Sequence, residues 1–105
     1  MVTDTHKKGI RMPTLHIEHP TPDFDTWKRA FDSDPAGRQR SGVRRYRVSR
    51  AVDDPNYVMI DLEFDTREQA EGLLRTMQGI WGRADHQVSR SQRARIVDTV
   101  DHREL

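Results

Sequence analysis

The chain has 105 residues, 33% of them hydrophobic and 33% charged, and its 18 basic and 17 acidic residues leave a formal net charge of +1. This length predicts one domain with a small core, and the near-zero net charge excludes a general attraction to nucleic acid or anionic membranes. The absence of cysteine excludes disulfides and thiolate chemistry, and no apolar run approaches the ~20 residues that cross a bilayer.

Residues 1–12 have no hydrophobic periodicity, and we expect them to form a flexible arm. They also lack the apolar stretch of a secretory signal, so we expect a cytoplasmic location. A first strand is predicted at residues 14–19, where Leu15 and Ile17 alternate with His16 and Glu18. The prolines that follow it lack the amide donor that a further strand residue would need.

A helix is predicted next, with Asp23 as its N-cap. The helix should end before Pro35, since the residue preceding a proline avoids helical geometry. Its apolar residues recur at helical spacing, so we predict that they are core residues. They are Phe24, Trp27, Ala30 and Phe31.

Two further strands are predicted at residues 43–52 and 57–64, joined by a turn at residues 53–56. In residues 57–64, read YVMIDLEF, every second residue is apolar, which is typical of a strand whose two faces differ chemically. A turn centred on Asp54 would place Arg47 opposite Asp61 and would pair two further opposite charges in the same hairpin. That second pair is Arg45 with Glu63.

Thr66 and Gln69 form a capping-box pattern, which predicts the start of a second helix. A loop at residues 79–91 follows and contains Trp81 and His86. A last strand is predicted at residues 94–100 and a polar tail at residues 101–105. The second helix has one apolar stripe, made of Ala70, Leu73, Leu74 and Met77.

The predicted order is β-α-β-β-α-β, an α+β chain. With right-handed crossovers this order forms a ferredoxin-like fold, a four-stranded antiparallel sheet with both helices on one face. The other sheet face is then polar. It is expected to carry His16, Glu18, Arg45, Arg47, Tyr57, Met59, Asp61, Glu63, Arg95, Val97 and Thr99.

The element order, the size and the stretches FDTWKRAF and DDPNYVMIDLEFDTREQAEGLL resemble the dimeric α/β-barrel superfamily over residues 13–100. That superfamily includes antibiotic-biosynthesis-monooxygenase-like and stress-responsive barrel domains, many of them uncharacterised bacterial proteins. The resemblance implies a homodimer in which two bare sheet faces close a barrel. It also implies a small aromatic or polyketide-like ligand, held between helices and sheet or inside the barrel. The Asn/Trp/His set of haem-degrading relatives is not recognisable, and no cofactor is expected.

Candidate site residues lie mainly on the polar sheet face. His16 is the candidate catalytic residue, a general base whose basicity a nearby carboxylate would raise. No metal site is predicted, because in the sequence His-Ile-Glu-His at residues 16–19 only His16 and Glu18 share a face. The candidate ligand-binding residues are Glu18, Arg45, Arg47, Tyr57, Asp61 and Trp81.

Six arginines lie in residues 38–50, but Asp61 and Glu63 on the same sheet would repel phosphate and no aromatic RNA-binding pattern is present. No nucleic-acid partner is therefore expected. Two functions remain open. The protein is a small-molecule binder or a cofactor-independent, monooxygenase-like enzyme, or it is a non-catalytic domain whose polar sheet face serves only as the subunit interface.

Overall fold

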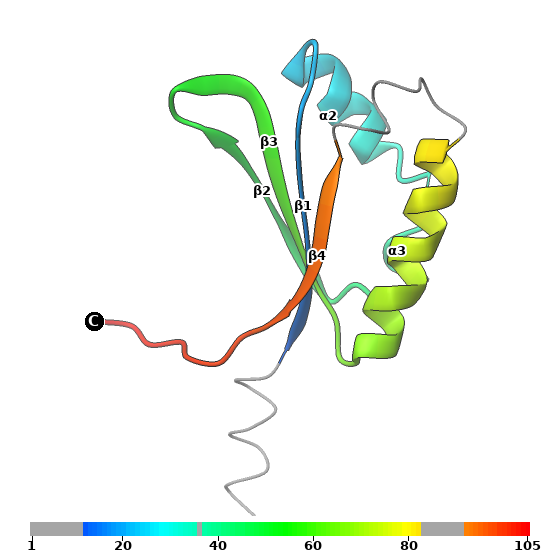
Figure 1. Cartoon of the computed structure of the whole chain (residues 1–105), viewed down its shortest axis with the longest axis vertical. Coiled ribbons are helices and arrows are strands. Elements are labelled where there is room, and N and C mark those ends of the chain that lie inside the picture. The colour runs from blue at the N-terminus through cyan, green and yellow to red at the C-terminus, as the bar shows by residue number, and fades with distance from the viewer. Residues whose placement is uncertain (1–11, 36, 83–91) are drawn as a thin grey trace, which may run out of the picture.

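The computed structural model describes residues 12–35, 37–82 and 92–105. All but the last residue of the predicted arm at residues 1–12 lies outside these ranges, as does His86. The chain forms six elements, shown in Figure 1. They are β1 (Pro13–Pro20), α2 (Phe24–Asp32), β2 (Arg45–Ala51), β3 (Asp54–Glu63), α3 (Arg67–Gly82) and β4 (Arg93–Asp98).

The strands form one antiparallel sheet in the order β2-β3-β1-β4, and both helices cover the same face of it (Figure 1). This is the predicted ferredoxin-like fold. The sheet face under the helices carries the core, because every second residue of β1 and β3 is apolar. The buried core residues are Leu15, Ile17, Phe31, Val58, Ile60, Leu62, Phe64, Ala70 and Leu73.

The hairpin register is confirmed along most of its length, with Arg47 opposite Asp61. The predicted turn at residues 53–56 is wrong, because β3 already begins at Asp54 and the turn is made by residues 52–53. Asn56 explains the difference. Its carbonyl oxygen accepts a hydrogen bond from the backbone of Thr21 at 2.7 Å, and its side chain accepts one from the backbone of Phe24 at 3.0 Å. These bonds tie the segment to the β1–α2 corner.

Both helices begin where capping residues predict. Asp23 accepts a hydrogen bond from the backbone N–H of Thr26 at 2.9 Å. Thr66 and Gln69 each accept a bond from the other's backbone N–H at 3.2 Å. The predicted loop at residues 79–91 is corrected, because α3 continues to Gly82.

Trp81 is therefore a helical residue and not a loop residue. Met77, Ile80 and Trp81 extend the apolar stripe of α3 at helical spacing and line one cavity with the sheet. A glycine within a helix costs only about 1 kcal/mol relative to alanine, so Gly79 does not end α3. The last strand is also shorter than predicted, since β4 ends at Asp98.

Of the four α2 residues predicted as core, Phe31 is buried, Phe24 and Trp27 are half-buried, and the prediction is wrong for Ala30, which is exposed. Trp27 packs against the core from α2, with its indole stacked on the Phe31 ring at a centroid distance of 5.1 Å.

Tyr46 of β2 is 46% exposed. It lies on an edge strand, where its ring forms a T-shaped pair with the Phe31 ring at a centroid distance of 5.3 Å and the Arg38 guanidinium lies 5.0 Å from its centroid.

Candidate functional site

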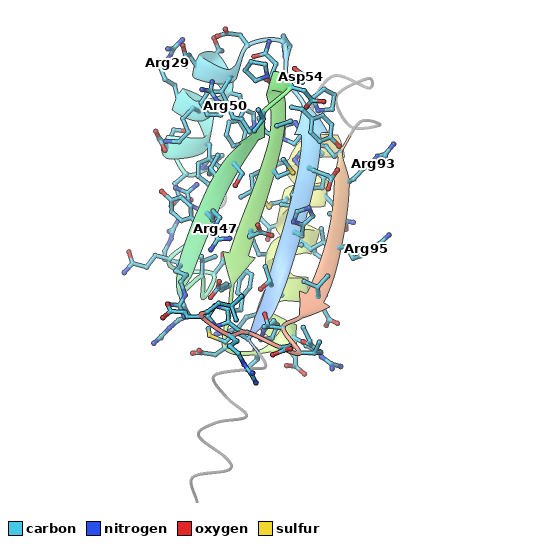
Figure 2. All side chains as sticks on the ribbon, turned by 90° about the vertical axis from the view of Figure 1, so that its left-hand side faces the viewer. Arg29, Arg47, Arg50, Asp54, Arg93 and Arg95 are labelled. Atoms are coloured by element: carbon cyan, nitrogen blue, oxygen red, sulfur yellow. The ribbon has the colours of Figure 1, made fainter. Side chains whose placement is uncertain are left out.

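Two regions of the molecule carry polar groups that could take part in chemistry, and they lie on opposite faces of the sheet. The polar face looks toward the viewer in Figure 2, with Arg47 on β2 and Arg93 and Arg95 on β4. The strand pairing brings His16 directly between Asp61 of β3 and Arg95 of β4.

His16 lies between two carboxylates. Its Nδ1–H donates to Asp61 at 2.7 Å and its Nε2–H donates to Glu18 at 2.8 Å. A carboxylate accepts hydrogen bonds, so both ring nitrogens carry a proton and the ring is an imidazolium. The hydrogen bond to Asp61, followed by that to Glu18, raises the pKa of His16 above its ordinary value despite partial burial.

Tyr57 extends this cluster from β3. Its hydroxyl donates to the second carboxylate oxygen of Glu18 at 2.6 Å. The bond raises the pKa of Tyr57 and, together with His16, lowers the pKa of Glu18. Four side chains are thus joined by consecutive hydrogen bonds in the order Asp61, His16, Glu18 and Tyr57.

The arginines of this face differ in their partners. Arg45 donates to Glu63 at 2.6 Å. Within the described ranges, Arg47, Arg93 and Arg95 make no hydrogen bond or ion pair with another side chain, and all three are exposed. They leave positive charge on the face that a partner or an anion could meet.

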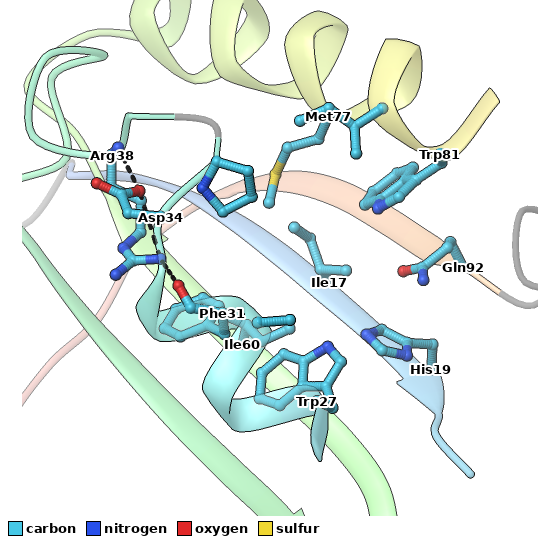
Figure 3. A pocket seen from close by; sticks show the side chains of 13 residues that line it. Ile17, His19, Trp27, Phe31, Asp34, Arg38, Ile60, Met77, Trp81 and Gln92 are labelled. Carbon is cyan, nitrogen blue, oxygen red and sulfur yellow. Dashed lines mark hydrogen bonds and ion pairs between the residues drawn. The ribbon is translucent and has the colours of Figure 1, made fainter. Parts of the chain in front are cut away.

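The structure thus brings most of the predicted site residues onto one face: His16, Glu18, Arg45, Arg47, Tyr57 and Asp61. Trp81 does not join them. It projects from α3 on the other side of the sheet, into the second region (Figure 3).

The second region is a cavity of about 150 Å³ between the two helices and the sheet. Its walls are mostly apolar, and the only two tryptophans of the chain both line it. Figure 3 shows Asp34 and Arg38 on one side and His19, Gln92 and Trp81 on the other. The remaining lining residues are Ile17, Trp27, Ala30, Phe31, Pro35, Ile60, Met77 and Ile80.

At one end of the cavity, Asp34 and Arg38 form a hydrogen bond and an ion pair with each other. The carboxylate of Asp34 accepts the backbone N–H of Arg38 at 2.8 Å and lies 3.5 Å from its guanidinium. The guanidinium also donates to the carbonyl oxygen of Phe31 at 2.7 Å and covers the Phe31 ring at 4.0 Å. The charged groups at this end of the cavity therefore already have partners.

His19 is the polar group that sequence reasoning passed over as a site residue. It is only 5% exposed, and burial lowers its pKa below the ordinary value, so the ring is neutral. The sequence did contain a signal for this burial. Side chains alternate between the two faces of a strand, so His19 lies on the same face of β1 as Leu15 and Ile17. Gln92 had no comparable signal, since its place in the cavity depends on how β4 pairs with β1.

Within the described ranges, no group of three His, Asp or Glu side chains is arranged to hold a metal ion. No helix in that part of the chain is long and apolar enough to cross a membrane.

No protein-family model matches the chain. No curated protein matches it either. Several solved structures are similar to the chain in fold. A candidate antibiotic biosynthesis monooxygenase from Nitrosomonas europaea is 17% identical, with a TM-score of 0.60 over 83% of this chain and 88% of that one. An ethyl tert-butyl ether d (ethd) family protein from Bacillus halodurans is 18% identical, with a TM-score of 0.56 over 82% of this chain and 96% of that one.

A dimeric ferredoxin-like protein from an uncultured marine organism is 10% identical, with a TM-score of 0.58 over 90% of this chain and 98% of that one. At these identities the likeness establishes the fold alone. It confirms the ferredoxin-like architecture that the resemblance to the dimeric α/β barrels implied.

Proposed function

We propose that this protein binds a small, largely apolar ligand of about one aromatic ring in the cavity between its helices and its sheet. The observation that carries the proposal is a cavity of about 150 Å³ with Trp27, Phe31 and Trp81 in its walls. An apolar cavity of roughly this size holds a benzene-sized molecule in other proteins. A pocket with apolar walls and a few polar groups is also the usual form of a small-molecule site.

The chemistry of the polar face supports the cavity as the ligand site. For His16 to act as a general base, one of its hydrogen bonds must break and its proton must leave, and both Asp61 and Glu18 oppose that loss. We therefore propose that the cluster around His16 serves the subunit interface. The predicted catalytic role of His16 stays a prediction.

The polar face is proposed to form a homodimer, as the resemblance implies. Arg47, Arg93 and Arg95 are exposed beside the carboxylates of the His16 cluster, so two copies of this face offer each other both signs of charge. Val97, 40% exposed on β4, adds apolar surface. Sedimentation velocity at micromolar concentration tests the dimer, and a monomer contradicts it. The cytoplasmic location also stays a prediction.

Tryptophan fluorescence tests the ligand site, because both tryptophans of the chain line the cavity. Toluene should change the emission saturably. Ala30→Phe fills the cavity from α2, from a residue that is exposed and so tolerates a larger side chain, and it should abolish the change. Ala51→Phe, at the end of β2 and outside the cavity, is the matched control and should leave the response intact.

Two outcomes contradict this proposal. If Ala30→Phe responds to toluene as wild type does, toluene binds outside the cavity. A wild-type protein without any response favours the non-catalytic dimerisation domain. If toluene and related rings do bind, mass spectrometry of the incubated mixtures shows whether the protein also transforms them, as a monooxygenase-like enzyme would.

A further inference from the structure

We infer that the ligand of the cavity carries a hydroxyl group, as a phenol or an enol does, and that this hydroxyl donates a hydrogen bond to Nε2 of His19 beside the amide of Gln92. The inference rests on the proposed function of the cavity and adds the chemical class of its ligand.

The tautomer of His19 is set by its backbone contact. Nδ1 lies 2.9 Å from the carbonyl oxygen of Pro20, and a carbonyl oxygen can only accept, so Nδ1 carries the proton. In a neutral imidazole the other nitrogen, Nε2, then presents a lone pair. No described residue donates a hydrogen bond to that nitrogen.

Gln92 supplies a second acceptor at the same place. The β1–β4 ladder pairs Glu18 with Arg93, so the next step of the same register sets Gln92 opposite His19. Side chains directly opposite each other on antiparallel strands have Cβ atoms about 4.5–5.5 Å apart. The Oε1 atom of Gln92 is buried and has no hydrogen-bond partner among the described residues.

An acceptor that is buried without a donor costs free energy, which a ligand hydroxyl would recover. Two acceptors at one end of a mostly apolar cavity, of which Gln92 Oε1 is buried without a donor among the described residues, favour a ligand that donates and is uncharged. The guanidinium of Arg38, at the other end, is already bonded to Asp34 and Phe31, so no cation is left in the cavity to meet a carboxylate. A neutral phenol or enol therefore fits better than an aromatic acid.

Phenol and toluene are a matched pair for the test, because they have nearly the same shape and differ in one hydroxyl. Binding of each is followed by tryptophan fluorescence, with excitation where neither ligand absorbs. Wild type should bind phenol at least as tightly as toluene. His19→Phe keeps a ring of similar size and removes Nε2. It should weaken phenol relative to toluene about tenfold, since one hydrogen bond is lost.

His102→Phe, the same substitution in the exposed C-terminal tail, is the control and should leave the ratio of the two dissociation constants unchanged. Gln92→Leu should lower the preference for phenol to a smaller extent. If His19→Phe binds toluene and keeps the preference for phenol, the inference is overturned and the proposed function stands. If wild type binds neither compound, the proposed function fails and the inference fails with it.

A measurement on the unsubstituted protein covers the case in which His19→Phe does not fold. The ¹⁵N resonance of His19 Nε2 should move when phenol is added and should stay in place with toluene. An unmoved resonance in a protein that phenol saturates overturns the inference.

Discussion

His16 and His19 lie three residues apart on β1 and behave as opposites. His16 is on the polar face, with a side chain 30% exposed and both ring nitrogens donating to carboxylates. His19 is buried on the helix-covered face against a carbonyl oxygen and the edge of the Trp27 ring. The first is held as a cation and the second as a neutral ring. The face of the sheet on which a histidine lies thus decides whether its ring is charged or neutral.

The same contrast separates Leu62 and Asp61, which are neighbours on β3. Leu62 is 0% exposed in the core, so Leu62→Ala should lower the free energy of unfolding by about 2–5 kcal/mol. Asp61→Asn changes a partly exposed ion pair and should cost no more than about 1 kcal/mol. Urea denaturation of both variants measures the difference. Equal losses would show that the polar face contributes to stability as a core does.

Association should depend on the charge of the polar face. Asp61→Arg removes the partner of His16 and places a third cation beside Arg45 and Arg47, so the dissociation constant of the dimer should rise at least about tenfold. Glu71→Arg makes the same charge change on an exposed position of α3 and is the control. Analytical ultracentrifugation measures both. An unchanged association for Asp61→Arg would exclude this face from the interface.

The two histidines should give stability opposite pH dependences. The pKa of His16 is raised, so its contribution is complete below its ordinary pKa of 6.5 and is lost as the pH rises through the raised value. The pKa of His19 is lowered, so its contribution is intact above 6.5 and is lost as the pH falls toward the lowered value.

Unfolding free energies measured across this pH range for wild type, His16→Gln and His19→Gln separate the two effects. His16→Gln should remove the loss on the alkaline side, and His19→Gln should remove the loss on the acid side. NMR titration of the ring protons in wild type gives the midpoints directly. Two midpoints on the same side of 6.5 would contradict the contrast between the faces.

The smallest effect is expected from the end of the hydrogen-bond chain. Tyr57→Phe removes the donor to Glu18 and should lower the free energy of unfolding by no more than about 1 kcal/mol, because water can replace the hydroxyl at this partly exposed position. It should also raise the pKa of Glu18, which the bond from Tyr57 lowers. Chemical denaturation and carboxyl ¹³C titration measure the two changes. A loss as large as that of Leu62→Ala would show that the cluster is a rigid core element.

Much of the fold was predictable from local pattern. Alternating apolar residues in β1 and β3 assigned the two faces of the sheet, and the hairpin register between Arg47 and Asp61 was predicted from the residues between the strands. The capping residues placed the starts of both helices. These features depend on neighbours along the chain, and their period is visible in the sequence. The end of α3 was predicted wrongly although its signal is local, because Met77, Ile80 and Trp81 continue the apolar stripe at helical spacing past Gly79.

The sequence by itself determined that His16 and Glu18 share the polar face and that His19 lies on the other. Only the tertiary structure decided what those groups do. The proton on Nδ1 of His16 depends on Asp61 of β3, which lies 45 residues further along the chain. The cavity exists because α2, α3 and the sheet do not fill the space between them, and Gln92 reaches it through the pairing of β1 with β4. Side-chain alternation is a local property of the backbone, whereas hydrogen-bond partners and empty volume arise only when distant segments pack together.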